Sequence, residues 1–159
     1  MGVSTRGLAA SAALLLVWGL GSSAVAPPQS IAERGVRLAL IRLNDLFGRR
    51  DLAIVDEFSA SPDTLLIGAD AGERFRGRGE LEAFFASLFA RPETFSFSWR
   101  EVDVAVRGEV AWLHAEGHVI ARTPGGEETR MPYRLAGVLE PHGRRWQWRL
   151  YQGSRAPVA

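Results

Sequence analysis

Three polar side chains alternate along one segment in a pattern that could support chemistry. His114, Glu116 and His118 are two residues apart, so on a β-strand they share a face, about 6–7 Å from one to the next. A histidine beside a carboxylate can bind a metal ion or move a proton, which makes His114 and Glu116 candidate catalytic residues. No further ligands with suitable spacing accompany them, and we predict neither a metal nor a cofactor. The alternative is a polar sheet face whose side chains pair across strands.

The next polar candidates lie side by side on a neighbouring segment. Arg134 could orient an anionic or carbonyl ligand, or it could form a structural ion pair with Glu116 on the preceding strand. The Tyr133 hydroxyl could donate to an oxyanion, or its ring could pack in the core with the hydroxyl exposed. The sequence therefore leaves both residues as candidate ligand contacts.

Composition excludes several classes of chemistry. Every basic residue is Arg, so Schiff-base catalysis and a P-loop lysine are excluded. The chain has no Cys, which excludes a thiol nucleophile and a disulfide. The glycine-punctuated loop 68–79 carries no phosphate-binding motif, and turn geometry explains its glycines. The domain after the N-terminal segment is electrically neutral, with 18 acidic residues matched by arginines, so we predict no binding to nucleic acid.

The N-terminus has the pattern of a signal peptide. Arg6 precedes a short apolar run from Leu8 to Leu20, and small residues follow. We predict cleavage after Ala24, with residues 25–30 as a linker, residues 31–157 as the folded domain, and a secreted or periplasmic location. The alternative is an uncleaved membrane anchor, although the apolar run is short for a membrane span.

Helical patterns precede a run of strand patterns. We expect a helix over residues 31–49 with Ser30 as its N-cap, a short helix capped by Asp51, and a third helix from Glu80. A short strand lies at residues 64–67, between the second and third helices. Four long alternating segments between Phe95 and Gln152 then predict an antiparallel meander. The order indicates one α+β domain in which three helices pack on a strongly curved antiparallel sheet.

The strands also predict where a pocket lies. A change of parity between Trp99 and Val102 indicates a β-bulge near residues 100–101, which bends the sheet. Strict alternation in the last strand predicts that four residues share one face: Trp146, Trp148, Leu150 and Gln152. We predict a mostly apolar pocket between this face and the helices, with Gln152 at its polar end. Its other predicted contacts are Phe84, Phe85, Trp112, Tyr133 and Arg134.

The residues from Ser30 to Pro157 resemble the SnoaL-like group of the nuclear transport factor 2-like superfamily. The similarity rests on the order of elements and on four stretches: Leu66–Asp70, Val110–Leu113, Arg134–Leu139 and Trp146–Ser154. The resemblance implies a cone-shaped fold. It does not imply one activity, because the superfamily contains isomerases, cyclases, dehydratases, hydrolases and binding proteins.

The resemblance implies a position for a general base. Ketosteroid isomerases of the superfamily use an Asp base and an oxyanion hole in an apolar cavity. Alignment on Gly77 places that base near Gly68, and Asp70 is the nearest carboxylate, although offset. Asp70 is therefore a candidate catalytic residue, with stabilisation of its own turn as the alternative. Similar members commonly carry His where this chain has Gln152, which cannot act as a proton-transfer base.

Two functions of different class follow. The first is an exported domain that binds a small hydrophobic molecule or a partner in its pocket. The second is an enzyme of ketosteroid-isomerase-like or hydrolase type that uses Asp70 or the His114–Glu116 pair.

The sequence also predicts how the domain assembles. Both faces of the strand around Tyr133 are apolar, so we predict a homodimer through the outer sheet face. Contact with a membrane is expected only if the N-terminal segment is not cleaved.

Overall fold

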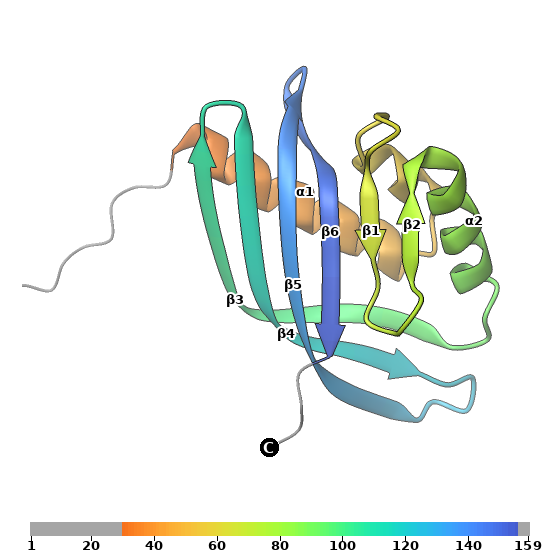
Figure 1. The fold of residues 1–159 in the computed structure, drawn as a ribbon. Coiled ribbons are helices and arrows are strands. Elements are labelled where there is room, and N and C mark those ends of the chain that lie inside the picture. Colours follow the sequence, from red (N-terminus) through yellow and green to blue (C-terminus); the bar gives the residue numbers. More distant parts are fainter. Residues whose placement is uncertain (1–29, 156–159) are drawn as a thin grey trace, which may run out of the picture.

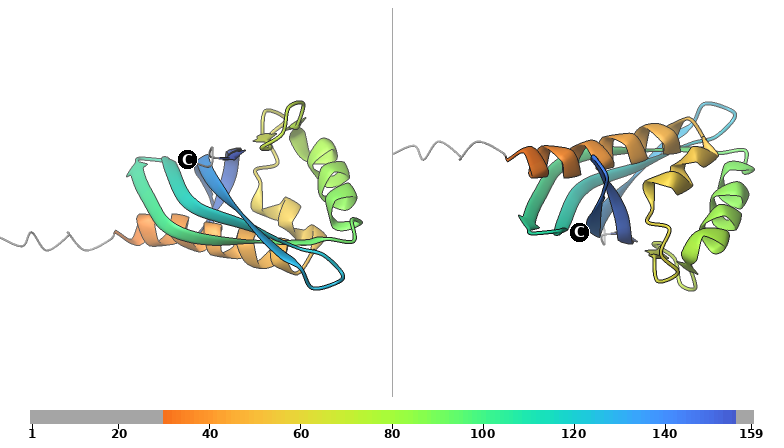
Figure 2. Two further views of the ribbon diagram at one scale, coloured as in Figure 1. Left: turned by 90° about the horizontal axis from the view of Figure 1, so that it is seen from below. Right: turned by 90° about the horizontal axis from the view of Figure 1, so that it is seen from above.

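The computed structural model describes residues 30–155, so the predicted signal peptide and most of the predicted linker lie outside the described residues. A curved six-stranded sheet wraps around one long helix, and the shorter helices stand at one end of the sheet (Figures 1 and 2). The helical elements are α1 (Ile31–Gly48), the 3-10 helix η1 (Leu52–Glu57) and α2 (Gly77–Phe89). The strands are β1 (Leu65–Ile67), β2 (Arg74–Arg76), β3 (Thr94–Arg107), β4 (Val110–Arg122), β5 (Glu128–His142) and β6 (Arg145–Arg155). The predicted α+β fold is confirmed.

Helix α1 begins at the predicted cap. The Ser30 side chain accepts a hydrogen bond from the Glu33 amide at 3.1 Å, and Glu33 accepts one in return from the Ser30 amide at 2.7 Å. This capping box satisfies amides that have no partner within the helix. Beyond the helix, Arg50 takes a left-handed conformation with φ 56°, and Asp51 then caps η1 as predicted. Arg50 thus separates the end of α1 at Gly48 from the start of η1 at Leu52.

The strand order in the sheet is β2-β1-β6-β5-β4-β3. All neighbours are antiparallel except β1 and β6, which run parallel, so the sheet is mixed rather than wholly antiparallel. That parallel pair places Ile67 beside Gln152, and it brings the loop after β1 to the end of β6. No helix among residues 30–155 is long and apolar enough to span a membrane.

Two bulges shape the sheet. The register shifts between Trp99 and Glu101, which confirms the predicted bulge. A second shift lies in β6, where Leu139 pairs with Trp148 but Val138 pairs with Leu150, so Arg149 is an extra residue. An extra residue reverses which side chains face inward beyond it.

The second bulge corrects the predicted faces of β6. Trp146 and Trp148 face inward as predicted, and Trp148 is fully buried. Beyond the bulge, however, Tyr151 is buried and Gln152 is exposed. Strict alternation had placed these two residues the other way round. The polar end of any internal pocket is therefore formed by other residues than Gln152.

Candidate functional site

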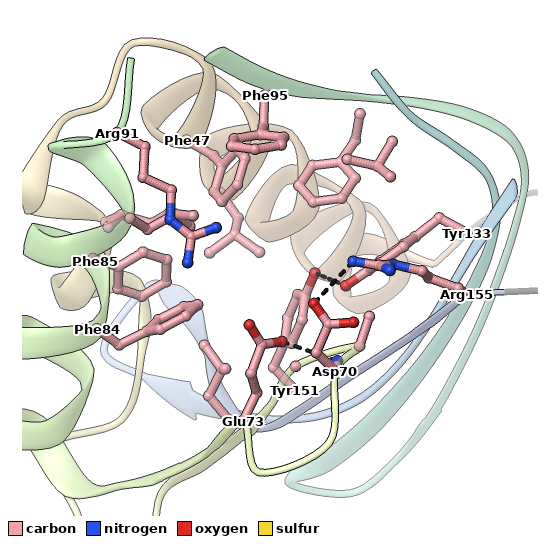
Figure 3. A pocket seen from close by; sticks show the side chains of 18 of the residues that line it. Phe47, Asp70, Glu73, Phe84, Phe85, Arg91, Phe95, Tyr133, Tyr151 and Arg155 are labelled. Atoms are coloured by element: carbon pink, nitrogen blue, oxygen red, sulfur yellow. Dashed lines mark hydrogen bonds and ion pairs between the residues drawn. The ribbon is translucent and has the colours of Figure 1, made fainter. Parts of the chain in front are cut away.

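A cavity of about 160 Å³ lies between the helices and the inner face of the sheet (Figure 3). Its lining comes from α1, η1, α2, the loop after β1 and the inner faces of β3 to β6. Eight aromatic side chains contribute to it: Phe47, Phe58, Phe84, Phe85, Phe95, Phe97, Tyr133 and Tyr151. A concave, mostly apolar space with few polar groups is the usual form of a small-molecule site.

The aromatic walls are held by ring contacts between elements. Phe47 of α1 packs against Phe97 of β3 with ring centroids 4.9 Å apart, and the ring centroids of Phe58, directly after η1, and Phe85 of α2 are 5.9 Å apart. These residues fall on the inward faces because α1 and α2 carry apolar residues at helical spacing. These ring contacts join α1, β3, η1 and α2 around the cavity.

Two tyrosine hydroxyls meet at the inner sheet face. The hydroxyl oxygens of Tyr133 and Tyr151 are 3.4 Å apart, and either can be the donor. Burial raises the pKa of Tyr133 and raises that of Tyr151 well above its ordinary value, so both hydroxyls stay protonated at physiological pH. Only one of the two protons can lie between the oxygens. The other is free to be donated to a ligand.

Tyr133 owes its position to a glycine on the adjacent strand. A Cβ atom at Gly153 would lie 1.7 Å from the Tyr133 hydroxyl oxygen and 2.6 Å from Cζ. The ring therefore needs a residue without a side chain beneath it. Gly153 therefore leaves the space that the Tyr133 hydroxyl needs in order to reach Tyr151.

An ion pair lies next to the tyrosines. Asp70 Oδ2 is 2.8 Å from a guanidinium nitrogen of Arg155, and the Asp70 amide donates to Glu73 Oε2 at 3.1 Å. The parallel pairing of β1 with β6 explains why residues so far apart in sequence meet here. In Figure 3, Asp70, Arg155 and both tyrosine hydroxyls lie on one side of the cavity, while Arg91 approaches from the end of α2.

Only part of the predicted set reaches this cavity. The structure places Phe84, Phe85 and Tyr133 along it, together with the candidate base Asp70. Trp146 and Trp148 face inward but belong to the packed core rather than to the cavity wall. The other predicted contacts do not line it: Trp112, Arg134, Leu150 and Gln152.

The remaining candidates lie together on the outer sheet face. Glu116 Oε1 is 3.0 Å from Arg134 Nε. This is the structural ion pair that the sequence left open as an alternative to ligand binding. His114 is 3.9 Å from Glu116 and 4.0 Å from Asp103. Within the described residues, no group of three or more His, Asp or Glu side chains could hold a metal ion. His114 and Glu116 are thus separated by the sheet from the cavity and from Asp70.

Sequence reasoning missed several residues that shape the cavity. Tyr151 was assigned to the other face because nothing in the sequence marks Arg149 as a bulge. Arg155 meets Asp70 only through the parallel β1–β6 pairing, whereas Glu73 meets Asp70 within the turn between β1 and β2. Nothing in the sequence around Arg91 predicts that it lines the cavity. A stronger signal was available in Phe95 and Phe97, whose parity places them on the inward face with Trp99.

The sequence of residues 36–159 matches the profile of the SnoaL-like domain. This chain belongs to the SnoaL-like domain family. The resemblance derived from the residues is therefore confirmed, and the match covers the cavity and all strands. Comparison with curated proteins gives no significant match.

Several solved structures share the fold of this SnoaL-like domain. A nuclear transport factor 2-like superfamily protein from Salmonella enterica serovar Typhimurium superposes with a TM-score of 0.69 at 16% identity, over 80% of this chain and 92% of the other. A ketosteroid isomerase-like protein from Erwinia carotovora atroseptica gives 0.66 at 19% identity, over 82% and 100%. An NTF2-like protein of unknown function from Pseudomonas putida gives 0.67 at 19% identity, over 80% and 88%. At these identities the similarity establishes the fold.

Proposed function

We propose that this SnoaL-like domain binds one small, mostly apolar molecule in the aromatic cavity. The observation that supports this proposal is an apolar space lined by phenylalanines on several elements, with a hydroxyl pair on one wall. The volume, about 160 Å³, compares with the roughly 150 Å³ of an engineered cavity that holds benzene. A ligand with one ring or a short alkyl chain therefore fits inside, and a longer ligand would extend through the open side.

The tyrosine pair replaces Gln152 as the polar end of the site. Its spare proton suits a hydrogen-bond acceptor on the ligand, such as a carbonyl or ether oxygen. Replacing Tyr151 by Phe removes one hydroxyl and leaves the ring. We expect such a ligand to bind about 1 kcal/mol more weakly to Tyr151→Phe.

Isothermal titration of acetophenone into the wild-type protein and the Tyr151→Phe variant measures this effect. Ethylbenzene, which lacks the acceptor, is the matched control and should bind both proteins equally. An equal loss for both compounds would mean that Tyr151 acts through packing rather than through its hydroxyl. Absence of binding by either compound to the wild-type protein would contradict the proposed function.

An acid–base enzyme is the second candidate, because Asp70 lies in the cavity near the tyrosine pair. In such a reaction Asp70 would accept a proton from the carbon next to a ketone, and the spare tyrosine proton would stabilise the enolate oxygen. Two features favour binding over catalysis. Arg155 already occupies the Asp70 carboxylate, and both tyrosine pKa values are raised rather than lowered. Exchange of the α-protons of a bound ketone in D2O, lost in Asp70→Asn, would establish the enzymatic alternative.

Export of the domain remains a proposal that the N-terminal sequence supports. We expect cleavage after Ala24 and a mature protein in the secreted or periplasmic fraction. N-terminal sequencing of the protein recovered from that fraction checks the site. A soluble protein that begins at Met1 would contradict export, and a full-length protein in the membrane fraction would support the anchored alternative.

A homodimer through the outer sheet face is likewise proposed. Trp112 is 47% exposed there, and its cross-strand neighbour Val138 pairs in turn with Leu150, which gives an apolar row on β4, β5 and β6. We expect light scattering to report a dimer at micromolar concentration and Trp112→Arg to shift it to a monomer. A wild-type monomer at high micromolar concentration would rule out this assembly.

A further inference from the structure

We propose that the natural ligand carries a carboxylate, which Arg91 binds at the edge of the cavity. The ligand class would then be an aromatic or short aliphatic carboxylic acid, with its apolar part among the phenylalanines. This inference rests on the proposed function, because it concerns the same cavity. It identifies the charge of the ligand, which the proposed function does not.

The first observation is an arginine without a partner. Arg91 lines the cavity, and Figure 3 shows its guanidinium directed toward the space beside Phe85. Within residues 30–155 this guanidinium makes no hydrogen bond and no ion pair, whereas the other cavity arginine, Arg155, is bound to Asp70. Five unused N–H donors beside an aromatic wall are a site for an acceptor with two oxygens.

The second observation is that the turn carrying Arg91 is held in place. Arg50, in its left-handed conformation, donates from one guanidinium nitrogen to the carbonyl oxygens of Pro92 and Glu93, at 3.2 and 2.5 Å. These bonds fix the backbone directly after Arg91 to the end of α1. The guanidinium is therefore presented by an ordered turn, which lowers the entropy cost of binding an anion.

The distribution of charge sets the orientation of the acid. Asp70 and Arg155 neutralise each other, and Glu73 lies with them on the side opposite Arg91 (Figure 3). Glu73 repels a carboxylate there, so the acid group belongs at Arg91 and the apolar part lies between them. A carboxylate binds a guanidinium through two parallel hydrogen bonds, and because Arg91 is exposed, added salt weakens this pairing.

A matched pair of ligands tests the inference. The affinities of 3-phenylpropanoate and 3-phenylpropanamide are measured by isothermal titration at low ionic strength. We expect the wild-type protein to bind the acid about tenfold more tightly than the amide. Arg91→Gln should abolish that preference and leave the amide affinity within about twofold. Arg107→Gln, which removes the same charge from the turn end of β3 outside the cavity lining, should keep the preference.

The outcomes separate this inference from the proposed function. Equal binding of acid and amide to the wild-type protein overturns the inference and leaves the proposed function standing. Binding of neither compound overturns both. A preference for the acid that persists in folded Arg91→Gln assigns the carboxylate to another group and also overturns the inference. If Arg91→Gln does not fold, the same titrations of the wild-type protein are repeated in high salt. Ion pairing at Arg91 predicts that the preference for the acid disappears there, and a preference that persists in high salt overturns the inference.

Discussion

Replacement of Glu57 by Gln should lower the free energy of unfolding by about 3 kcal/mol. Glu57 is 2% exposed at the end of η1, and its carboxylate binds Arg42 Nε at 2.9 Å and the guanidinium of Arg145 through its other oxygen. It thus joins α1, η1 and the start of β6. A Gln side chain accepts with only one atom, and its amide group would face the donors of one arginine. The arginines are partly exposed and can be rehydrated, which keeps the loss at the lower end for a broken buried ion pair.

Urea unfolding of the variant measures the loss, with Arg49→Gln as the control. Arg49 and Asp45 form an exposed pair at 3.0 Å, for which we expect a change within about 0.5 kcal/mol. A similar, small change in both variants would show that the Glu57 network does not connect the three elements energetically.

The second large effect is expected at Gly153. An added Cβ would meet the Tyr133 hydroxyl oxygen at 1.7 Å, so Gly153→Ala must displace that ring toward the cavity. Crowding of this kind costs about 1–3 kcal/mol of stability. Because the displaced ring also breaks the hydroxyl pair and occupies the ligand space, the affinity for acetophenone should fall by at least about tenfold.

A second substitution distinguishes this clash from a general effect of the methyl group. Shortening the neighbour in Gly153→Ala/Tyr133→Leu should recover part of the lost stability. The control is Gly79→Ala, on the solvent side of α2, where nothing lies within 4 Å of the new Cβ. This variant should keep the wild-type affinity, and its stability should be unchanged or slightly higher. An unchanged affinity in Gly153→Ala would place the ligand away from Tyr133.

Local patterns in the sequence were sufficient for much of the fold. The capping residues Ser30 and Asp51, the apolar stripe of α1 and the bulge at Arg100 all follow from spacing and side-chain type. They are local features, and each is determined by residues within a few positions. The family assignment followed because the order of these elements is distinctive.

The site was harder to predict because it depends on one register shift and one distant pairing. The bulge at Arg149 places Tyr151, and not Gln152, on the inner face of the sheet. No residue type in this strand indicates the bulge. The parallel β1–β6 pairing joins Asp70 to Arg155 across most of the domain. Alternation also could not decide which face of β4 meets the helices, so His114 and Glu116 remained candidates for chemistry although they lie outside.

Ligand binding in the aromatic cavity is the central claim, and Met131 offers a direct measurement of it. The sequence has two methionines, Met1 and Met131, and Met131 lines the cavity on β5. A protein labelled with methyl-13C methionine therefore gives one cavity signal, with any Met1 signal as an internal reference. We predict that acetophenone or 3-phenylpropanoate moves the Met131 methyl resonance saturably, through ring currents, and leaves Met1 unmoved. A Met131 resonance that stays in place up to the solubility limit of both compounds would contradict the account.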